Sequence, residues 1–65
     1  MQVKLEREDD GRWIGEVAAL PGVLAYGETA DEARKNAEVL AFRVIADRLE
    51  HGEPVPREVR ELFAA

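Results

Sequence analysis

The sequence predicts an α+β fold, in which three antiparallel strands form a meander and one long helix packs on it. Three observations lead to this fold class. Residues 2–8 alternate apolar and charged side chains, which is the pattern of a half-buried strand. Two turn signals, Asp9-Asp10-Gly11 and Leu20-Pro21-Gly22, separate that segment from two further short strands. A capping sequence then opens a long helix-forming segment.

The first two strands, residues 2–8 and 12–18, can be paired on paper. A three-residue loop, in which Gly11 takes the left-handed conformation, pairs Lys4 with Glu16 and Glu8 with Arg12. Both pairs join opposite charges on one face, and such cross-strand pairs contribute about 0.2–1 kcal/mol each. A two-residue loop would instead place apolar residues opposite charges, so the three-residue register is preferred.

The same register defines the other face of the hairpin, which we expect to be the core face. On this face the register pairs Val3 with Val17, Leu5 with Gly15, and Arg7 with Trp13. Gly15 leaves room for another element to approach closely. Arg7 is expected to lie over the ring of Trp13.

The third strand is expected over residues 23–26, after a type II turn with Pro21 and Gly22 at its centre. The helix is expected over Ala30–Glu50. Thr29 and Glu32 form a capping box at its start, and His51 with Gly52 ends it.

One stripe of this helix carries the residues expected to pack on the sheet, namely Ala33, Ala37, Leu40, Ala41 and Val44. The second half of the helix is apolar well beyond that stripe. Something other than three strands must therefore cover it, and the candidates are the C-terminal segment and a second subunit. We take Phe42, Ile45, Ala46 and Leu49 as a candidate oligomer interface. A Pro-containing connector then leads to residues 57–65, which are expected to form a short helix, with a fourth strand as the alternative.

The chain of 65 residues is expected to form one domain, residues 1–65. A domain of this size buries only about 60% of the surface that its unfolded chain exposes. It contains no cysteine, so no disulfide can support its small core. We therefore expect a homodimer or higher homo-oligomer.

Charge and hydropathy restrict the classes of partner. The net charge is −5, which makes free nucleic acid a poor partner and a basic protein a better one. No apolar run approaches the roughly 20 residues that cross a bilayer, so no membrane association is expected and the protein is predicted to be cytoplasmic. The many charged residues and few amides are compatible with a thermophile, as they are with a GC-rich genome.

The residues available for catalysis are few. The chain contains neither serine nor cysteine, and its one histidine, His51, is expected to end the helix. Asp9 and Asp10 suit a hairpin turn, and Glu8 and Glu16 have cross-strand basic partners, so a metal site built from these carboxylates is not favoured. We therefore predict that the protein is not an enzyme, and that it has no catalytic residue, cofactor or metal ion.

A series of short motifs resembles the N-terminal domain of the HicB-like antitoxins. The motifs lie between Glu8 and Pro56, and the most telling are Leu20-Pro21-Gly22, Gly27-Glu28-Thr29, Glu32-Ala33, Asn36-Ala37 and Gly52-Glu53-Pro54-Val55-Pro56. The resemblance implies a partial RNase H-like fold without that enzyme's active-site carboxylates. It also implies a partner, a small basic HicA-type toxin that cleaves RNA and whose active site the antitoxin occludes.

The sequence departs from the fuller family pattern in its C-terminal part. Many such antitoxins carry a C-terminal DNA-binding domain, and residues 57–65 are too short for one, so direct DNA binding is not expected. The family also often has a final strand here, which keeps the fourth-strand alternative open. The candidate toxin contacts are Lys4, Glu6, Ile14 and Glu16, on the sheet face opposite the helix. The alternative function is that of a stand-alone oligomeric interaction or structural protein without a toxin partner.

Overall fold

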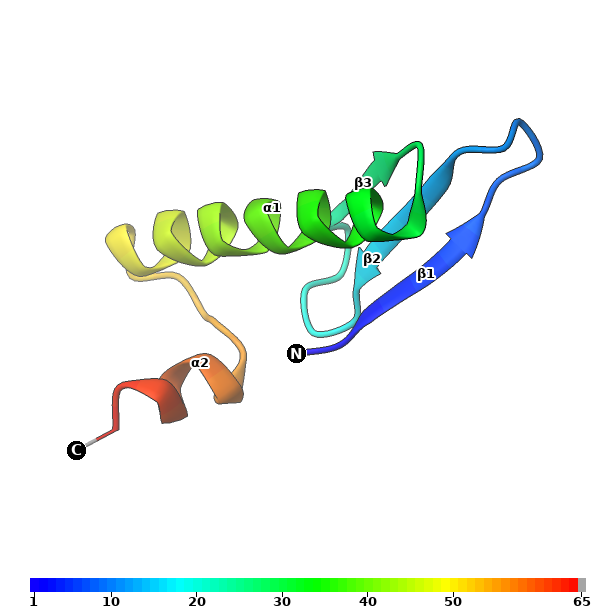
Figure 1. Cartoon of the computed structure of the whole chain (residues 1–65). Helices are drawn as coiled ribbons and strands as arrows, with labels where there is room; N and C mark the ends of the chain where they lie inside the picture. The colour runs from blue at the N-terminus through cyan, green and yellow to red at the C-terminus, as the bar shows by residue number, and fades with distance from the viewer. Residues whose placement is uncertain (65) are drawn as a thin grey trace.

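The computed structural model describes residues 1–64 and confirms the predicted architecture. Strands β1 (Val3–Arg7), β2 (Trp13–Val17) and β3 (Leu24–Gly27) form one antiparallel sheet in the order β1-β2-β3. Helix α1 (Ala30–Glu50) crosses one face of this sheet and extends well beyond it. Helix α2 (Arg57–Leu62) lies beyond the N-terminal end of β1 (Figure 1). Within the described residues, neither helix is long and apolar enough to cross a membrane.

The hairpin register predicted from the sequence is confirmed from Val3–Val17 to Arg7–Trp13. The loop closes as expected, because Gly11 has a φ of 91° and the amide of Glu8 donates to the carbonyl of Arg12 at 2.7 Å. Strands β1 and β2 are one residue shorter at each end than predicted, and β3 begins and ends one residue later. Backbone hydrogen bonds at Glu8 and Ala18 continue the hairpin pairing one residue past the bounds of the two strands.

The polar contacts of the hairpin differ from the expected ones. Arg12 forms an ion pair with Asp10 at 2.8 Å, not with Glu8. Its guanidinium also lies 4.5 Å from the centre of the Tyr26 ring. Among the described residues this is the cation–π contact that forms, so the expected contact between Arg7 and Trp13 is wrong. Arg12 therefore lies against Asp10 and Tyr26, and Tyr26 belongs to β3, which the hairpin pattern alone does not include.

The turn before β3 is the predicted type II turn. The amide of Val23 donates to the carbonyl of Leu20 at 2.9 Å, and Gly22 has a φ of 86°. Such a φ is costly for any residue with a Cβ, which explains the glycine. The turn carries Leu20 into the core, where it is fully buried.

The first turn of α1 lies directly on the sheet at two glycines. A Cβ at Gly15 would lie 3.0 Å from the Ala33 carbonyl oxygen, and a Cβ at Gly27 would lie 2.8 Å from the Glu32 carbonyl carbon. The close approach expected at Gly15 is therefore confirmed, and Gly27 is a second such position. Thr29 caps the helix by accepting a hydrogen bond from the Glu32 amide at 3.0 Å. The Glu32 carboxylate reaches back to the amide of Glu28, one residue before the expected capping-box partner.

The core lies between the sheet and α1 and is made of aliphatic side chains. Its buried members are Val17, Leu20, Val23, Ala37, Ala41, Ile45 and Val59. The predicted helix stripe is correct for its alanines, whereas Leu40 and Val44 are only half-buried and Ile45 is buried in their place. The small alanines let α1 approach the sheet, and Ile45 then continues their side of the helix past the end of the strands.

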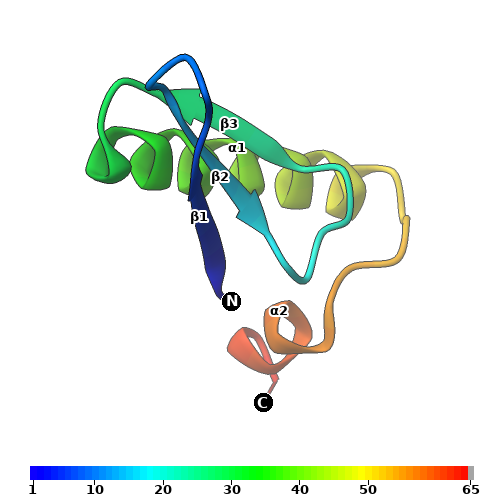
Figure 2. The same cartoon turned by 90° about the vertical axis from the view of Figure 1, so that its right-hand side faces the viewer.

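The C-terminal segment forms the expected short helix, which spans Arg57–Leu62 and not the whole of residues 57–65. A fourth strand is absent from the described residues, and Ala65 lies outside them. α1 ends at His51, whose ring nitrogen contacts the Asp47 carbonyl at 2.8 Å, and Gly52 follows with a φ of 68°. The connector then turns α2 back beneath α1, as a second view shows (Figure 2). α2 is held by Val59, which is 2% exposed.

Candidate functional site

The four predicted toxin contacts lie together on the sheet face that α1 does not cover. The register places them in two rows, because Lys4 faces Glu16 and Glu6 faces Ile14. Side chains of alternate strand residues share a face, and these four alternate with the core-facing positions. The three charged residues are exposed and Ile14 is half-buried at the centre.

Strand β3 adds two residues to this face that the sequence reasoning missed. Leu24 lies beside Glu16, and Tyr26 lies beside Ile14. Their side chains are 37% and 42% exposed. A register for β2 and β3, counted from the Leu20-Pro21-Gly22 turn, would have included both. We call the six residues Lys4, Glu6, Ile14, Glu16, Leu24 and Tyr26 the outer sheet face.

The outer sheet face combines carboxylates with exposed apolar and aromatic surface. Its net charge is negative, since Glu6 and Glu16 outnumber Lys4. Arg12 lies over Tyr26 at one edge and holds that ring in place. Carboxylates around an apolar centre suit contact with a protein surface that presents lysine or arginine side chains.

The acidic hairpin loop has a structural role. Asp10 accepts hydrogen bonds from the backbone amide of Arg12 at 3.0 Å and from its Nε at 2.8 Å. These bonds, first the backbone one and then the side-chain one, hold the pKa of Asp10 below its usual value of 3.8. Within residues 1–64, no group of three or more histidine or acidic side chains is placed to hold a metal ion.

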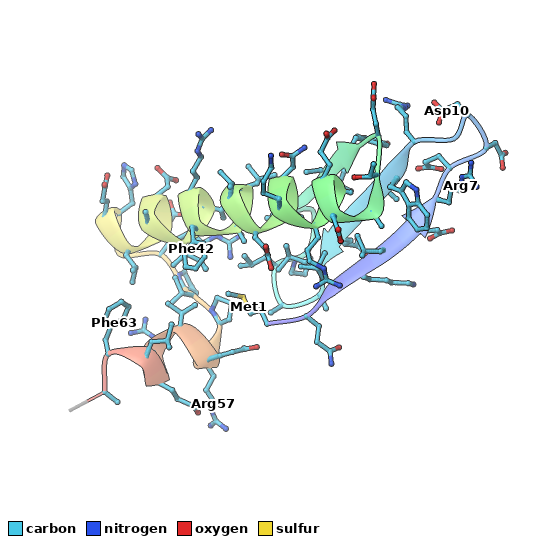
Figure 3. All side chains as sticks on the ribbon, viewed as in Figure 1. Met1, Arg7, Asp10, Phe42, Arg57 and Phe63 are labelled. Carbon is cyan, nitrogen blue, oxygen red and sulfur yellow. The ribbon has the colours of Figure 1, made fainter. Side chains whose placement is uncertain are left out.

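A second surface is apolar and lies on the other side of the molecule. Met1, Phe42 and Phe63 point into the space between α1 and α2 (Figure 3). They line a hollow of about 370 Å³ together with Ile45, Ala46, Leu49, Val59 and Leu62. We call its exposed large side chains, Met1, Phe42, Leu49, Leu62 and Phe63, the apolar flank.

The predicted oligomer-interface residues take two positions in this hollow. Phe42 is 67% exposed and Leu49 is 46% exposed, and both belong to the apolar flank. Ile45 is 6% exposed and forms part of the floor. The sequence reasoning missed Leu62 and Phe63 of the C-terminal segment, which are 71% and 75% exposed. Their helical spacing was visible in the sequence, but the way in which the connector folds back was not.

The chain is similar to a protein from a thermophilic archaeon. It is 32% identical over 59 residues to "UPF0150 protein Ta0767" of Thermoplasma acidophilum, and the match covers 91% of this chain and 86% of that relative. The chain belongs to the UPF0150 family. UPF0150 is a HicB-like family, so membership agrees with the resemblance carried by the sequence motifs. No family profile and no solved structure matches this UPF0150 chain.

Proposed function

We propose that this protein is an antitoxin-like binding module that neutralises a small, basic, RNA-cleaving toxin of the HicA type. The observation that carries the proposal is the outer sheet face, where Glu6 and Glu16 flank the apolar Ile14. Membership of a HicB-like family supports it, as does the net charge of −5. The toxin is a HicA-type protein only by the family resemblance.

The physical mechanism is competition for positive charge. A toxin that grips RNA must present lysine and arginine side chains to the phosphates. An acidic partner is attracted to the same surface and associates faster than a neutral one. Ile14, Leu24 and Tyr26 would then bury apolar area at the centre of the contact. In this proposal the protein acts by occlusion and is not an enzyme, which agrees with the structural use of Asp10 and His51.

The test is co-expression of the wild-type chain with a basic toxin encoded beside it, read by pull-down and by rescue of growth. Reversing Glu6 and Glu16 to lysine should slow association and weaken its salt dependence while the far-ultraviolet circular dichroism stays unchanged. The matched control is Glu53→Lys with Glu58→Lys, which changes the net charge equally at exposed positions away from the outer sheet face. A neighbouring toxin that remains active and unbound would defeat the proposal.

A second candidate function, that of an oligomeric interaction protein, is favoured by the apolar flank. From the exposed fractions of its five side chains, the flank presents on the order of 500 Å² of apolar surface. The largest apolar patch on a typical monomer covers about 300–600 Å² and is often functional, so the flank is comparable to such a patch. A stable homodimer needs about 800 Å² per partner, of which about 65% is apolar. Phe42→Glu should therefore lower the sedimentation coefficient of an oligomer, and a wild-type chain that sediments as a monomer at micromolar concentration would contradict this function.

A further inference from the structure

The two edges of the sheet are not equivalent. At the β3 edge, the side-chain amide of Asn36 in α1 donates to the backbone carbonyl of Tyr26 at 2.8 Å. This bond satisfies an outward-facing group of β3 and ties that edge to the helix. At the other outermost strand, β1, no side chain of the described residues forms a comparable hydrogen bond with an outward-facing backbone group. In both views β1 runs away from α2 along its whole length (Figures 1 and 2).

The backbone groups that face outward from β1 follow from the hairpin register. The amide of Glu8 donates to Arg12 and the amide of Ala18 donates to the carbonyl of Gln2. The hydrogen-bonding direction alternates along an antiparallel strand, so the even-numbered residues of β1 bond to β2. The N–H and C=O groups of Val3, Leu5 and Arg7 therefore point out from the open edge.

An open row of this kind is a template for another strand. Natural sheets cover or charge such edges, and β1 carries charges at Lys4, Glu6 and Arg7. A strand that pairs with β1 must therefore present charges complementary to these. Val3 and Leu5 lie on the α1 side and are only half-buried. The edge thus offers both unpaired backbone groups and incompletely covered core side chains.

We propose that β1 pairs antiparallel with β1 of a second copy of this chain, about a two-fold axis at Leu5, to give a continuous six-stranded sheet. This inference rests on the second candidate function, that the chain forms oligomers, and not on the presence of a toxin. The partner is a second copy because the charges of β1 are complementary to themselves in this register.

The charges select one register from three. Centred on Leu5, the pairing places Lys4 opposite Glu6 of the second copy, and the two-fold axis repeats that pair. Centred on Lys4, it would place the two lysines opposite each other. Centred on Glu6, it would place the two glutamates opposite each other. Opposite charges across strands stabilise pairing and like charges destabilise it, so only the Leu5-centred register is favourable.

That register also meets the backbone requirement. It joins Leu5 to Leu5 and Val3 to Arg7 of the second copy, which are the residues whose amides and carbonyls face outward. Every outward group of β1 then gains a partner. The symmetric arrangement is an isologous two-fold interface, the commonest form of homodimer.

The surface beside β1 is shaped to receive the second copy. A hollow of about 180 Å³ lies between β1 and α1, lined by Met1, Val3, Val17, Glu38, Ala41 and Phe42. Met1 and Phe42 also belong to the apolar flank. A copy added at the β1 edge would cover Val3 and Leu5 and adjoin the start of that flank, so strand pairing and apolar burial would contribute to one interface.

The first test uses two single variants that are complementary to each other. Glu6→Lys carries lysine at both positions 4 and 6, and Lys4→Glu carries glutamate at both. Each variant alone should dimerise about tenfold more weakly than wild type, since two attractive pairs become repulsive. Mixed in equal amounts, they should recover the wild-type affinity as heterodimers, measured by sedimentation equilibrium and native mass spectrometry.

The controls for this test are Glu53→Lys and Lys35→Glu, which make the same charge changes at exposed positions away from β1. Lys4→Glu also faces Glu16 within the chain, so circular dichroism must show that it is folded. Recovery of dimerisation in the mixture would also show that Lys4→Glu is folded, because an unfolded chain would not pair. Dimerisation that is equal in the single variants and in the mixture would overturn the proposed register.

The second test is a cross-link. The natural chain has no cysteine, and paired residues at a two-fold axis have Cα atoms about 5.5 Å apart, within disulfide range. Leu5→Cys should form a covalent dimer on mild oxidation. Arg7→Cys should not, since its two copies would lie about 13 Å apart along the strands at about 3.3 Å per residue.

The outcomes of these tests distinguish a failure of the β1 strand pairing from a failure of the oligomer function on which it rests. A wild-type monomer at micromolar concentration overturns both the strand pairing and the oligomer function. A wild-type dimer whose Leu5→Cys variant does not cross-link, while Arg7→Cys does, overturns the strand pairing alone and leaves the apolar flank as the interface.

Discussion

The side-chain amide of Asn36 donates a hydrogen bond to the backbone carbonyl of Tyr26 at 2.8 Å. The bond joins the second turn of α1 to the edge of β3 and satisfies one outward-facing carbonyl of that strand, whereas no described side chain makes such a bond to β1. A contact between two residues ten positions apart in the sequence thereby makes the two edges of the sheet different. The bond requires the side chain of Asn36. It does not require a tyrosine at position 26, because Tyr26 contributes only its backbone carbonyl.

Replacing Asn36 by alanine should lower the free energy of unfolding by about 1 kcal/mol, the usual net value of such a hydrogen bond, with more if the carbonyl stays unsatisfied. Urea unfolding measures the change. Asn36→Asp is the matched comparison: it keeps the shape but has no amide to donate. An unchanged midpoint in both variants would show that water replaces the bond without cost.

Replacing Gly27 by alanine should destabilise the fold by about 1–3 kcal/mol or more, because the new methyl group meets the backbone of Glu32 and Ala33. Gly22→Ala provides the comparison. It meets open space but has a φ of 86°, so its cost is conformational, about 1–2 kcal/mol. Only Gly27→Ala should also shift α1, seen as amide chemical-shift changes in the first turn of the helix. Shifts of equal size in both variants would contradict the steric account.

Replacing Thr29 by alanine should cost about 1 kcal/mol, since the Glu32 amide loses its side-chain acceptor. Thr29→Ser keeps that oxygen and should retain most of the stability. Hydrogen exchange of the first-turn amides should accelerate in the alanine variant and not in the serine variant. Equal exchange rates in the two would show that the hydroxyl does not cap the helix.

The pH dependence of stability should contain a small contribution from Asp10. Hydrogen bonds from Arg12 hold its folded-state pKa below 3.8, whereas the unfolded chain has the ordinary value of about 3.9. The contribution is therefore complete above the unfolded pKa and is lost as the pH falls through the folded one. Asp10→Asn should remove this part of the acid dependence, measured by thermal unfolding between pH 2 and about pH 6.

The control for that measurement is Asp9→Asn, which leaves the contact between Asp10 and Arg12 in place. A carboxyl-carbon titration by NMR reports the pKa of Asp10 directly. A folded-state pKa at or above the unfolded value would contradict the account. Since both side chains are about half exposed, the effect should shrink in high salt.

The sequence by itself determined the local structure of this protein. The hairpin register followed from Gly11 and from the charges along two strands, and the start of α1 followed from Thr29. Such features depend on neighbouring residues only: a glycine at positive φ, a hydroxyl that caps an amide, and alternation along a strand. The same is true of the four charged or apolar residues placed together on the outer sheet face, since two paired strands were enough to position them.

Only the tertiary structure determined which residues the surface side chains contact and which apolar residues remain exposed. Arg12 lies over Tyr26 because β3 packs beside β2, and the pairing of the first two strands alone does not include that contact. Ile45 is buried and Phe42 is exposed, although both lie on the apolar half of one helix. Their difference depends on where α1 leaves the sheet and where the connector returns α2. Those positions arise from packing many side chains at once, and neighbouring residues in the sequence do not specify them.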